Sequence, residues 1–305
     1  MPYDKLSFLS GVAVGRNMES WPAFDGSDAL VFIVKIDSVL TSMRYRFLTH
    51  LESGVIDWGD GIVEQVQQQR WLYNTHVYSD PGVYVIQVTG TLLGVSWGQA
   101  TTEKDPTCLV SVNTPIPDIP ENRLPYVVDA IYSSSPLFQG CSNLAYIHPQ
   151  LFKAYTREGV TFCTRSNMFG QCKNLKTVPA KLFHNVHFRG LTSGGTLIRP
   201  DLQAYFTGCT SLKSVPDGLF DNPWLEDCYN IQSLFAGCSA LEDFPDDLFS
   251  GMLDVTNCVQ AFENCKSITK RVPELWNSYP NANGTQCFRG CINAENYEDI
   301  PAEWK

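Results

Sequence analysis

The sequence Phe206-Thr-Gly-Cys-Thr-Ser-Leu-Lys-Ser-Val-Pro-Asp-Gly-Leu-Phe220 is one copy of a phrase that returns six times in the second half of the chain. In each copy a cysteine follows a phenylalanine by three residues, and a proline and an aromatic residue come later. A phrase repeated at intervals of roughly 30 residues indicates an array of structural repeats. The phenylalanines and cysteines of the six copies are Phe138 and Cys141, Phe169 and Cys172, Phe206 and Cys209, Phe235 and Cys238, Phe262 and Cys265, and Phe288 and Cys291.

One copy is too small to bury its own apolar side chains, so the copies must stack on one another. We therefore predict a solenoid of about six coils, with the six phenylalanines in one buried column. The alternating segment Lys213-Ser-Val215 predicts a short strand, and Pro216 a helical turn that begins at the proline. The repeat cysteines are predicted to be small, buried, reduced thiols, as suits folding in a reducing compartment.

The remaining cysteines hold no fixed position in the repeated phrase and include no C-x2-C pair, so they predict neither zinc ligands nor disulfides. We expect no metal site and no cofactor. His184 and His187 are a close histidine pair, for which we expect a solvated surface position. The cysteines outside the phrase are Cys108, Cys163, Cys228, Cys258 and Cys287.

The copy Asn167-Met168-Phe169-Gly-Gln-Cys172-Lys-Asn-Leu175 resembles the BspA-like leucine-rich repeats of bacterial surface proteins. The resemblance covers residues 133–305 and implies a leucine-rich-repeat solenoid used for adhesion or protein recognition. It implies no catalytic residue. The insertion at residues 188–200 departs from the family pattern, and we expect it to project as a loop.

The first half contains a second motif, Asp57-Trp58-Gly59-Asp60-Gly61, which is followed by His76-Val-Tyr78 and by Pro81-Gly-Val-Tyr84. Its glycines and aspartates are typical of a tight turn, and the residues after Pro81 alternate like a strand. We expect earlier strands at residues 30–36 and 45–49.

These phrases together resemble a PKD domain, which is a β-sandwich of the immunoglobulin type. The resemblance places that domain at residues 28–112. It also implies that Asp57, Asp60, His76 and Tyr78 stabilise the fold instead of binding metal or catalysing a reaction. The segment after Val88, residues 89–107, is predicted to add a hairpin.

The predicted organisation is an N-terminal helix or arm at residues 1–27, the PKD-like sandwich, a proline-rich linker at 113–132 and the repeats. The four prolines of residues 113–125 predict a stiff spacer that holds two rigid modules apart. The net charge of −10 argues against nucleic acid and anionic membranes as partners. No stretch approaches the ~20 apolar residues of a membrane span.

The sequence has no G-x-S-x-G, P-loop, G-x-G-x-x-G or H-E-x-x-H motif, and we expect no enzymatic activity. The pair of modules favours a recognition protein exposed on a particle. The outward face of the repeats and the insertion at residues 188–200 are predicted to bind a protein or a glycan. Free thiols without a recognisable signal sequence favour a phage virion protein. We expect it to dock to other virion proteins through residues 1–27 and to be an oligomer or part of a larger assembly. The alternatives are a secreted bacterial adhesin, a glycan-degrading enzyme built on the solenoid, and an intracellular scaffold.

Overall fold

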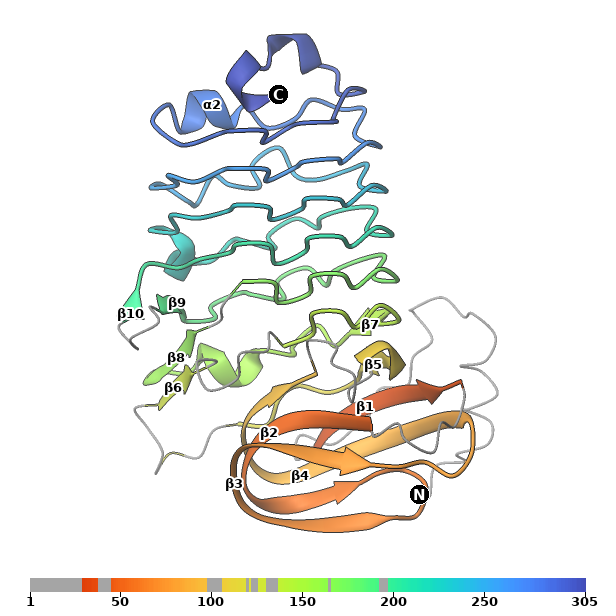
Figure 1. The fold of residues 1–305 in the computed structure, drawn as a ribbon. Helices are drawn as coiled ribbons and strands as arrows, with labels where there is room; N and C mark the ends of the chain where they lie inside the picture. Colours follow the sequence, from red (N-terminus) through yellow and green to blue (C-terminus); the bar gives the residue numbers. More distant parts are fainter. Residues whose placement is uncertain are drawn as a thin grey trace.

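The computed structural model of the protein describes residues 29–37, 45–97, 106–118, 121, 126–129, 137–163, 166–191 and 197–305. Figure 1 shows two regions, a β-sheet from the first half of the chain and a stack of layered turns from the second half. The helix or arm predicted at residues 1–27 lies outside the described residues.

The first region is a six-stranded mixed sheet with the strand order β3-β2-β4-β1-β5-β7. All neighbours are antiparallel except β5 and β7, which are parallel. Strands β1 and β2 include the predicted strands at 30–36 and 45–49, and β4 runs on through the predicted hairpin region as far as Ser96. The strands are β1 (Ala29–Ile36), β2 (Tyr45–Asp57), β3 (Val63–His76), β4 (Gly82–Ser96), β5 (Leu109–Val112) and β7 (Tyr146–Ile147).

The predicted fold class, an all-β sandwich followed by a leucine-rich-repeat solenoid, is wrong. The strands described between residues 29 and 112 belong to one sheet, instead of two sheets packed face to face. That sheet also takes in β7 from the repeat region. The repeats do not form the strands expected of leucine-rich coils, because most pairings between copies are isolated bridges, and the described α-helix there, α2 (Leu275–Ser278), has four residues.

Residues of left-handed φ keep the repeats out of the strand conformation. Ala204, two residues before Phe206, has φ 57°, and Gly208, two residues after it, has φ 69°. The equivalent positions around Phe235 and Phe262 also have positive φ. Because positive φ lies outside the β region, the chain forms turns here. Hydrogen bonds still join the copies, since the Phe206 N–H donates to the Leu234 carbonyl at 2.9 Å.

The six repeat phenylalanines are buried and stack one on the next, which confirms the predicted column. Ring centroids of successive members lie 5.4–5.6 Å apart. A second aromatic column begins with Phe152, Phe183, Phe220 and Phe249, whose successive centroids lie 5.7–6.4 Å apart. These two columns lie in the core of the stack, together with buried leucines, valines and cysteines. Figure 1 shows the copies lying in successive layers above the sheet.

The insertion at 188–200 is not a simple loop. Its ends pair as antiparallel strands, β9 (Phe188–Leu191) and β10 (Leu197–Ile198), and residues 192–196 lie outside the described part. β9 continues a sheet on the flank of the stack, with the order β10-β9-β8-β6. The other two strands are β6 (Tyr126–Asp129) and β8 (Val160–Cys163), and the 3-10 turns are η2 (Pro106–Cys108), η5 (Lys153–Thr156), η6 (Pro223–Leu225), η7 (Tyr297–Asp299) and η8 (Ala302–Trp304).

The described start of the proline-rich segment, residues 113–118, connects the two regions closely. The Thr114 hydroxyl accepts from the Val31 N–H of β1, and the Ile116 N–H donates to the Leu151 carbonyl of the first repeat. Ile116 is buried in a core that is continuous from the sheet into the stack. This part of the segment therefore packs the regions together instead of spacing them apart. Among the described residues, no helix has the length and apolar character needed to cross a bilayer.

Candidate functional site

The turn between β2 and β3 is built by its own aspartates. Asp57 Oδ1 accepts from the Gly59 N–H at 2.8 Å, and Asp60 Oδ1 accepts from the Ile62 N–H at 3.0 Å. Gly59 has φ +82°, and a Cβ atom there would lie 2.5 Å from the Val85 carbonyl oxygen of β4. Glycine is therefore required by both the backbone angle and the space.

The predicted motif residues Asp60, His76 and Tyr78 are brought together behind this turn. His76 Nε2 lies 2.6 Å from Asp60 Oδ2, and the His76 ring stacks on Trp58. The Tyr78 hydroxyl donates to the Trp58 carbonyl at 3.0 Å. Burial tends to raise the pKa of Asp60, but the Ile62 N–H and His76 outweigh it and lower that pKa overall. Each of these contacts is internal to the turn and its neighbours.

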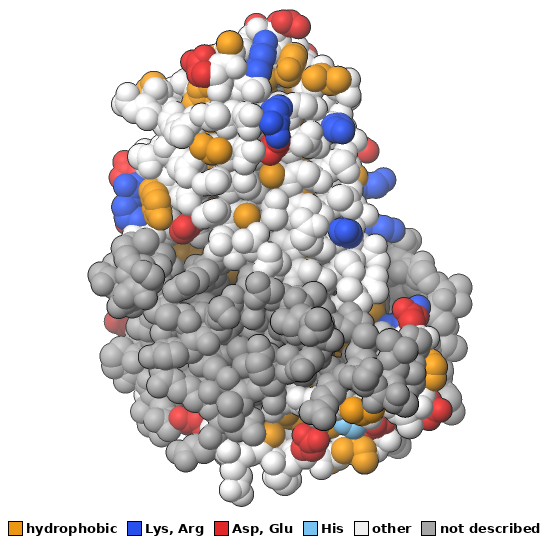
Figure 2. All heavy atoms as spheres, in the orientation of Figure 1, with side chains coloured by type: hydrophobic (Ala, Val, Ile, Leu, Met, Phe, Trp, Pro, Cys, Tyr) orange, Lys and Arg blue, Asp and Glu red, His pale blue; other side chains and the backbone are white. Residues whose placement is uncertain are grey.

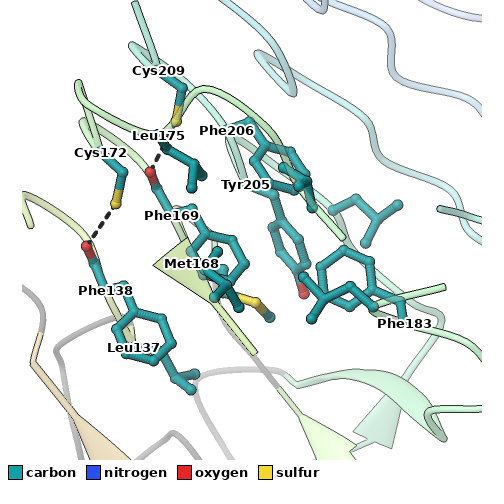
Figure 3. Close-up of a cluster of buried hydrophobic side chains, with 14 of the residues drawn as sticks. Leu137, Phe138, Met168, Phe169, Cys172, Leu175, Phe183, Tyr205, Phe206 and Cys209 are labelled. Carbon is teal, nitrogen blue, oxygen red and sulfur yellow. Dashed lines mark hydrogen bonds between the residues drawn. The ribbon is translucent and has the colours of Figure 1, made fainter. Parts of the chain in front are cut away.

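The repeat cysteines form a thiol column beside the phenylalanines. The Cys209 thiol donates to the Phe169 carbonyl at 3.2 Å, and that carbonyl also accepts the N–H of Cys172. Figure 3 shows this thiol and that of Cys172 directed at carbonyl oxygens of the preceding copy. The contact recurs at 3.1 Å for Cys238, Cys265 and Cys291. From Cys172 onward, each repeat cysteine thus links its copy to the one before.

The cysteines whose side chains are described are buried, as predicted for the repeat thiols, and form no disulfide with one another. Burial raises the pKa of Cys209 and Cys291 to about 12, since it disfavours the thiolate. Among the described residues, no cluster of three or more His, Cys, Asp or Glu side chains has an arrangement that could hold a metal ion.

An Asx column that was not predicted lies five residues before four of the phenylalanines. Asp201, Asn230, Asn257 and Asn283 pair in register from copy to copy. Each side-chain oxygen accepts the N–H two residues later, at 2.8–3.2 Å. An asparagine or aspartate at a fixed distance before the phenylalanine is the signal that could have revealed it.

An open pocket of about 600 Å³ lies on the flank of the stack, beside the inserted hairpin. It is lined by residues of η6, of the following copy and of β9, namely Arg189, Pro223, Trp224, Glu226, Asp227, Leu253 and Asp254. Trp224 and Leu253 are 36% and 63% exposed, large values for apolar side chains. Figure 2 shows acidic, basic and hydrophobic side chains close together on the side of the molecule where Figure 1 places β10.

The position of Trp224 is fixed by Asn222 and β9. The buried Asn222 side chain accepts from the Trp224 N–H and donates to the Phe183 and Val186 carbonyls of the preceding copy. The Trp224 ring also packs on His187, with centroids 4.3 Å apart, and under the Arg189 guanidinium at 5.5 Å. Since β9 and the preceding copy both hold it, the indole is a rigid wall of the pocket.

Two arginines from the ends of the insertion hold the charged side chains of the pocket. Arg189 Nη1 lies 3.5 Å from Asp227 Oδ1. Arg199 Nε donates to the Asp227 carbonyl at 2.8 Å, and its Nη2 lies 3.4 Å from Asp254 Oδ2. The insertion therefore contributes an organised array of donors and acceptors on one side of the pocket.

Comparisons with family models, with curated proteins and with solved structures found no match to this chain. The phrase Asn222-Pro223-Trp224 could have indicated the pocket from the sequence. An asparagine cap and a proline at the first helical position predict a short helical turn, and Trp224 is the next residue of that turn.

Proposed function

We propose that the protein is a recognition protein and that the flank pocket is its binding site. The observation that carries this proposal is the exposure of Trp224 and Leu253 inside a pocket of about 600 Å³. Binding sites combine apolar walls with a few fixed polar groups, and the arginines and aspartates supply those groups. The aromatic and thiol columns beneath provide a rigid support.

The differences between copies support the same assignment. The inward positions repeat from copy to copy, whereas the outward position occupied by Lys176 and Lys213 becomes Glu242 in the following copy. Stacking requires the first set to stay constant, but it places no such demand on the second. The chain therefore offers a varied outer surface on a repeated interior, as a recognition protein needs.

We further propose that the protein works on the surface of a particle, in the first instance a phage virion. The buried free thiols support this setting, since they suit a chain that folds in a reducing cytoplasm before release. A secreted bacterial adhesin is the alternative setting for the same binding function. Attachment to a particle through residues 1–27 belongs to this proposal, and those residues lie outside the described part.

The test is an array of immobilised oligosaccharides and peptides probed with the full chain. The double variant W224A/L253A removes both apolar walls, and I292A removes an equally exposed aliphatic residue that does not line the pocket. We expect wild type and I292A to bind the same spots and the double variant to lose them. Equal binding by all three proteins, or no binding by the wild type, would overturn the proposal.

The enzymatic alternative predicts a different result in the same assay. A glycan-degrading enzyme would release shortened oligosaccharide from the spots it binds, whereas a recognition protein would leave them intact. Mass spectrometry of the eluted ligand distinguishes the two, and shortened products that W224A/L253A fails to make would favour the enzyme.

A further inference from the structure

We infer that the flank pocket takes a neutral, hydroxyl-rich ligand, that is, a segment of an uncharged oligosaccharide. The inference rests on the proposed binding function and adds the chemical class of the ligand. It follows from three properties of the pocket: its balance of charges, its mixture of donors and acceptors, and its apolar wall.

The charges of the pocket nearly balance and leave little attraction for an ion. Glu226, Asp227 and Asp254 line it with carboxylates, which would repel an anion. Arg189 lies in the lining, and Arg199 is bound to Asp254 at its edge, so two guanidinium groups offset most of the attraction that the three carboxylates have for a cation. Because the two aspartates already have arginine partners, a charged ligand would also have to displace existing ion pairs. A neutral ligand carries neither cost.

The polar groups of the pocket match hydroxyl groups. A hydroxyl both donates and accepts, so it needs acceptors and donors close together. Carboxylates only accept and guanidinium groups only donate, and Asp227 and Arg189 place one of each 3.5 Å apart. Neighbouring hydroxyls of a sugar ring can use both at once, in charge-assisted hydrogen bonds.

The apolar wall matches the other surface of a sugar ring. Pro223, Trp224 and Leu253 line the pocket beside the charged groups, with the indole held in place from behind. The C–H face of a sugar ring can cover such a wall while its hydroxyls point at the polar side. Leu253 N–H donates to the Glu226 carbonyl at 2.8 Å, so the pocket spans two neighbouring copies and favours a chain over a single sugar.

The test is an NMR titration of the full chain with hexasaccharides, observed at the Trp224 indole N–H. The neutral panel contains hexamers of glucose, mannose, galactose and N-acetylglucosamine. The charged controls are the glucosamine hexamer, which is cationic, and the galacturonate hexamer, which is anionic. The Trp224 resonance is assigned by its loss in W224F. We expect at least one neutral hexamer to shift it and to bind more tightly than either charged control.

The variant E226Q separates a neutral ligand from a cationic one. Glutamine keeps an acceptor oxygen but removes the charge, so the affinity for a neutral hexamer should change by less than about threefold and depend little on salt. W224A lacks the observed resonance, so its affinity is measured by isothermal titration calorimetry beside the wild type, and it should be weaker by about tenfold or more, because the variant removes the stacking surface. A cationic ligand would instead lose about tenfold with E226Q and lose further affinity at high salt.

The inference is overturned if no neutral hexamer shifts the Trp224 resonance, or if a charged control binds more tightly than every neutral one. Its failure is distinguishable from failure of the proposed function. Array binding to peptides alone, abolished by W224A/L253A, would keep the pocket as the site and replace the sugar with a protein partner. Array binding that W224A/L253A leaves unchanged would overturn both the sugar ligand and the pocket as the binding site.

Discussion

The sheet and the repeat stack meet the same physical demand in different ways. Buried N–H and carbonyl groups must be paired. In the sheet, long strands such as the 13-residue β2 and the 15-residue β4 pair their backbones over most of their length, with shifts of register near Leu51. In the stack, left-handed residues interrupt the strand, and a few backbone bonds per copy are supplemented by the cysteine thiols and the Asx side chains.

This difference determines where each region is sensitive to substitution. A strand tolerates changes at many positions because its register is spread over many backbone pairs. A repeat copy depends on a few inward side chains that must match those of the next copy. The sheet closes one end of the stack through β5 and β7, and Trp304 covers Gly284 at the other end.

Raising the pH should have the largest effect, and the thiols that cause it lie in the stack. Burial raises the pKa of Cys209, Cys228, Cys258 and Cys291 from an ordinary 9.0 to about 12. The stability these thiols contribute is therefore present below about pH 9 and is lost as the pH rises toward 12. Between these two pKa values, each thiol lowers the free energy of unfolding by about 1.4 kcal/mol per pH unit. Several thiols together can therefore exceed the unfolding free energy of a typical domain, which is ~5–15 kcal/mol.

We expect the free energy of urea unfolding, measured with a reductant present, to fall steeply between about pH 9 and 11. Tryptophan fluorescence should follow circular dichroism, because the sheet and the stack share one core. An unfolding free energy that stays constant over this range would contradict the burial of the thiols. If the stack unfolded while the circular dichroism of the sheet persisted, the two regions would be shown to unfold independently.

Replacing Phe206 by alanine should have the next largest effect. Its ring lies between Phe169 and Phe235 at 5.5 and 5.6 Å, in the interior of the column. Removal leaves a cavity between neighbouring copies and should lower the free energy of unfolding by about 3–5 kcal/mol. I292A, at an exposed position of the last copy, is the control and should cost less than about 0.5 kcal/mol. Similar losses in the two variants would contradict the column.

Replacing Cys209 by serine should have a smaller effect. The shorter, more polar hydroxyl takes the place of a thiol that reaches the Phe169 carbonyl at 3.2 Å. Its desolvation without an equally good hydrogen bond should cost roughly 1–3 kcal/mol. Chemical denaturation of C209S and C209A measures this, and C209A should be the milder change, because it buries no new hydroxyl. Greater stability of C209S over the wild type would contradict the account.

Replacing Asp60 by asparagine should have the smallest effect, and it concerns the sheet. Because the pKa of Asp60 is lowered on folding, its stabilising contribution is present above its ordinary value of 3.8 and disappears as the pH falls through the folded value. The pair with His76 is partly exposed, so D60N should cost about 1 kcal/mol or less at neutral pH. Thermal melts should show the difference from wild type shrinking below about pH 4, and a constant difference would contradict this role.

The repeated phrase was sufficient to predict the buried columns. The phenylalanine and the cysteine of each copy, such as Phe206 and Cys209, keep a fixed spacing, because they stack on their equivalents in the next copy. The coil geometry was not predictable in the same way. Gln171 has positive φ at a position where most copies use glycine, and a glutamine does not indicate a left-handed angle in a sequence. Asn264, at the same position of another copy, is a residue type that adopts this angle readily, as glycine does. The sequence of the repeats therefore predicted short strands, whereas their backbone forms turns.

The sheet was mispredicted for a different reason. Alternating apolar residues such as those after Pro81 predict strands, but the pattern is the same for one sheet and for two. The pocket was missed because its parts are distant in sequence. Arg189, Trp224 and Asp254 meet only when the hairpin and two later copies lie side by side, and Asn222, which orients the tryptophan, acts through contacts with the preceding copy.

The central claim is that stability and binding reside in different residues of the stack, and a paired measurement on W224A tests it most directly. Urea unfolding and array binding are measured on the same preparation of wild type, W224A and F206A. We predict that W224A loses binding while its free energy of unfolding falls by less than about 1.5 kcal/mol, the scale of its contacts with His187 and Arg189. W224A that binds like the wild type, or that unfolds as readily as F206A, would contradict the claim.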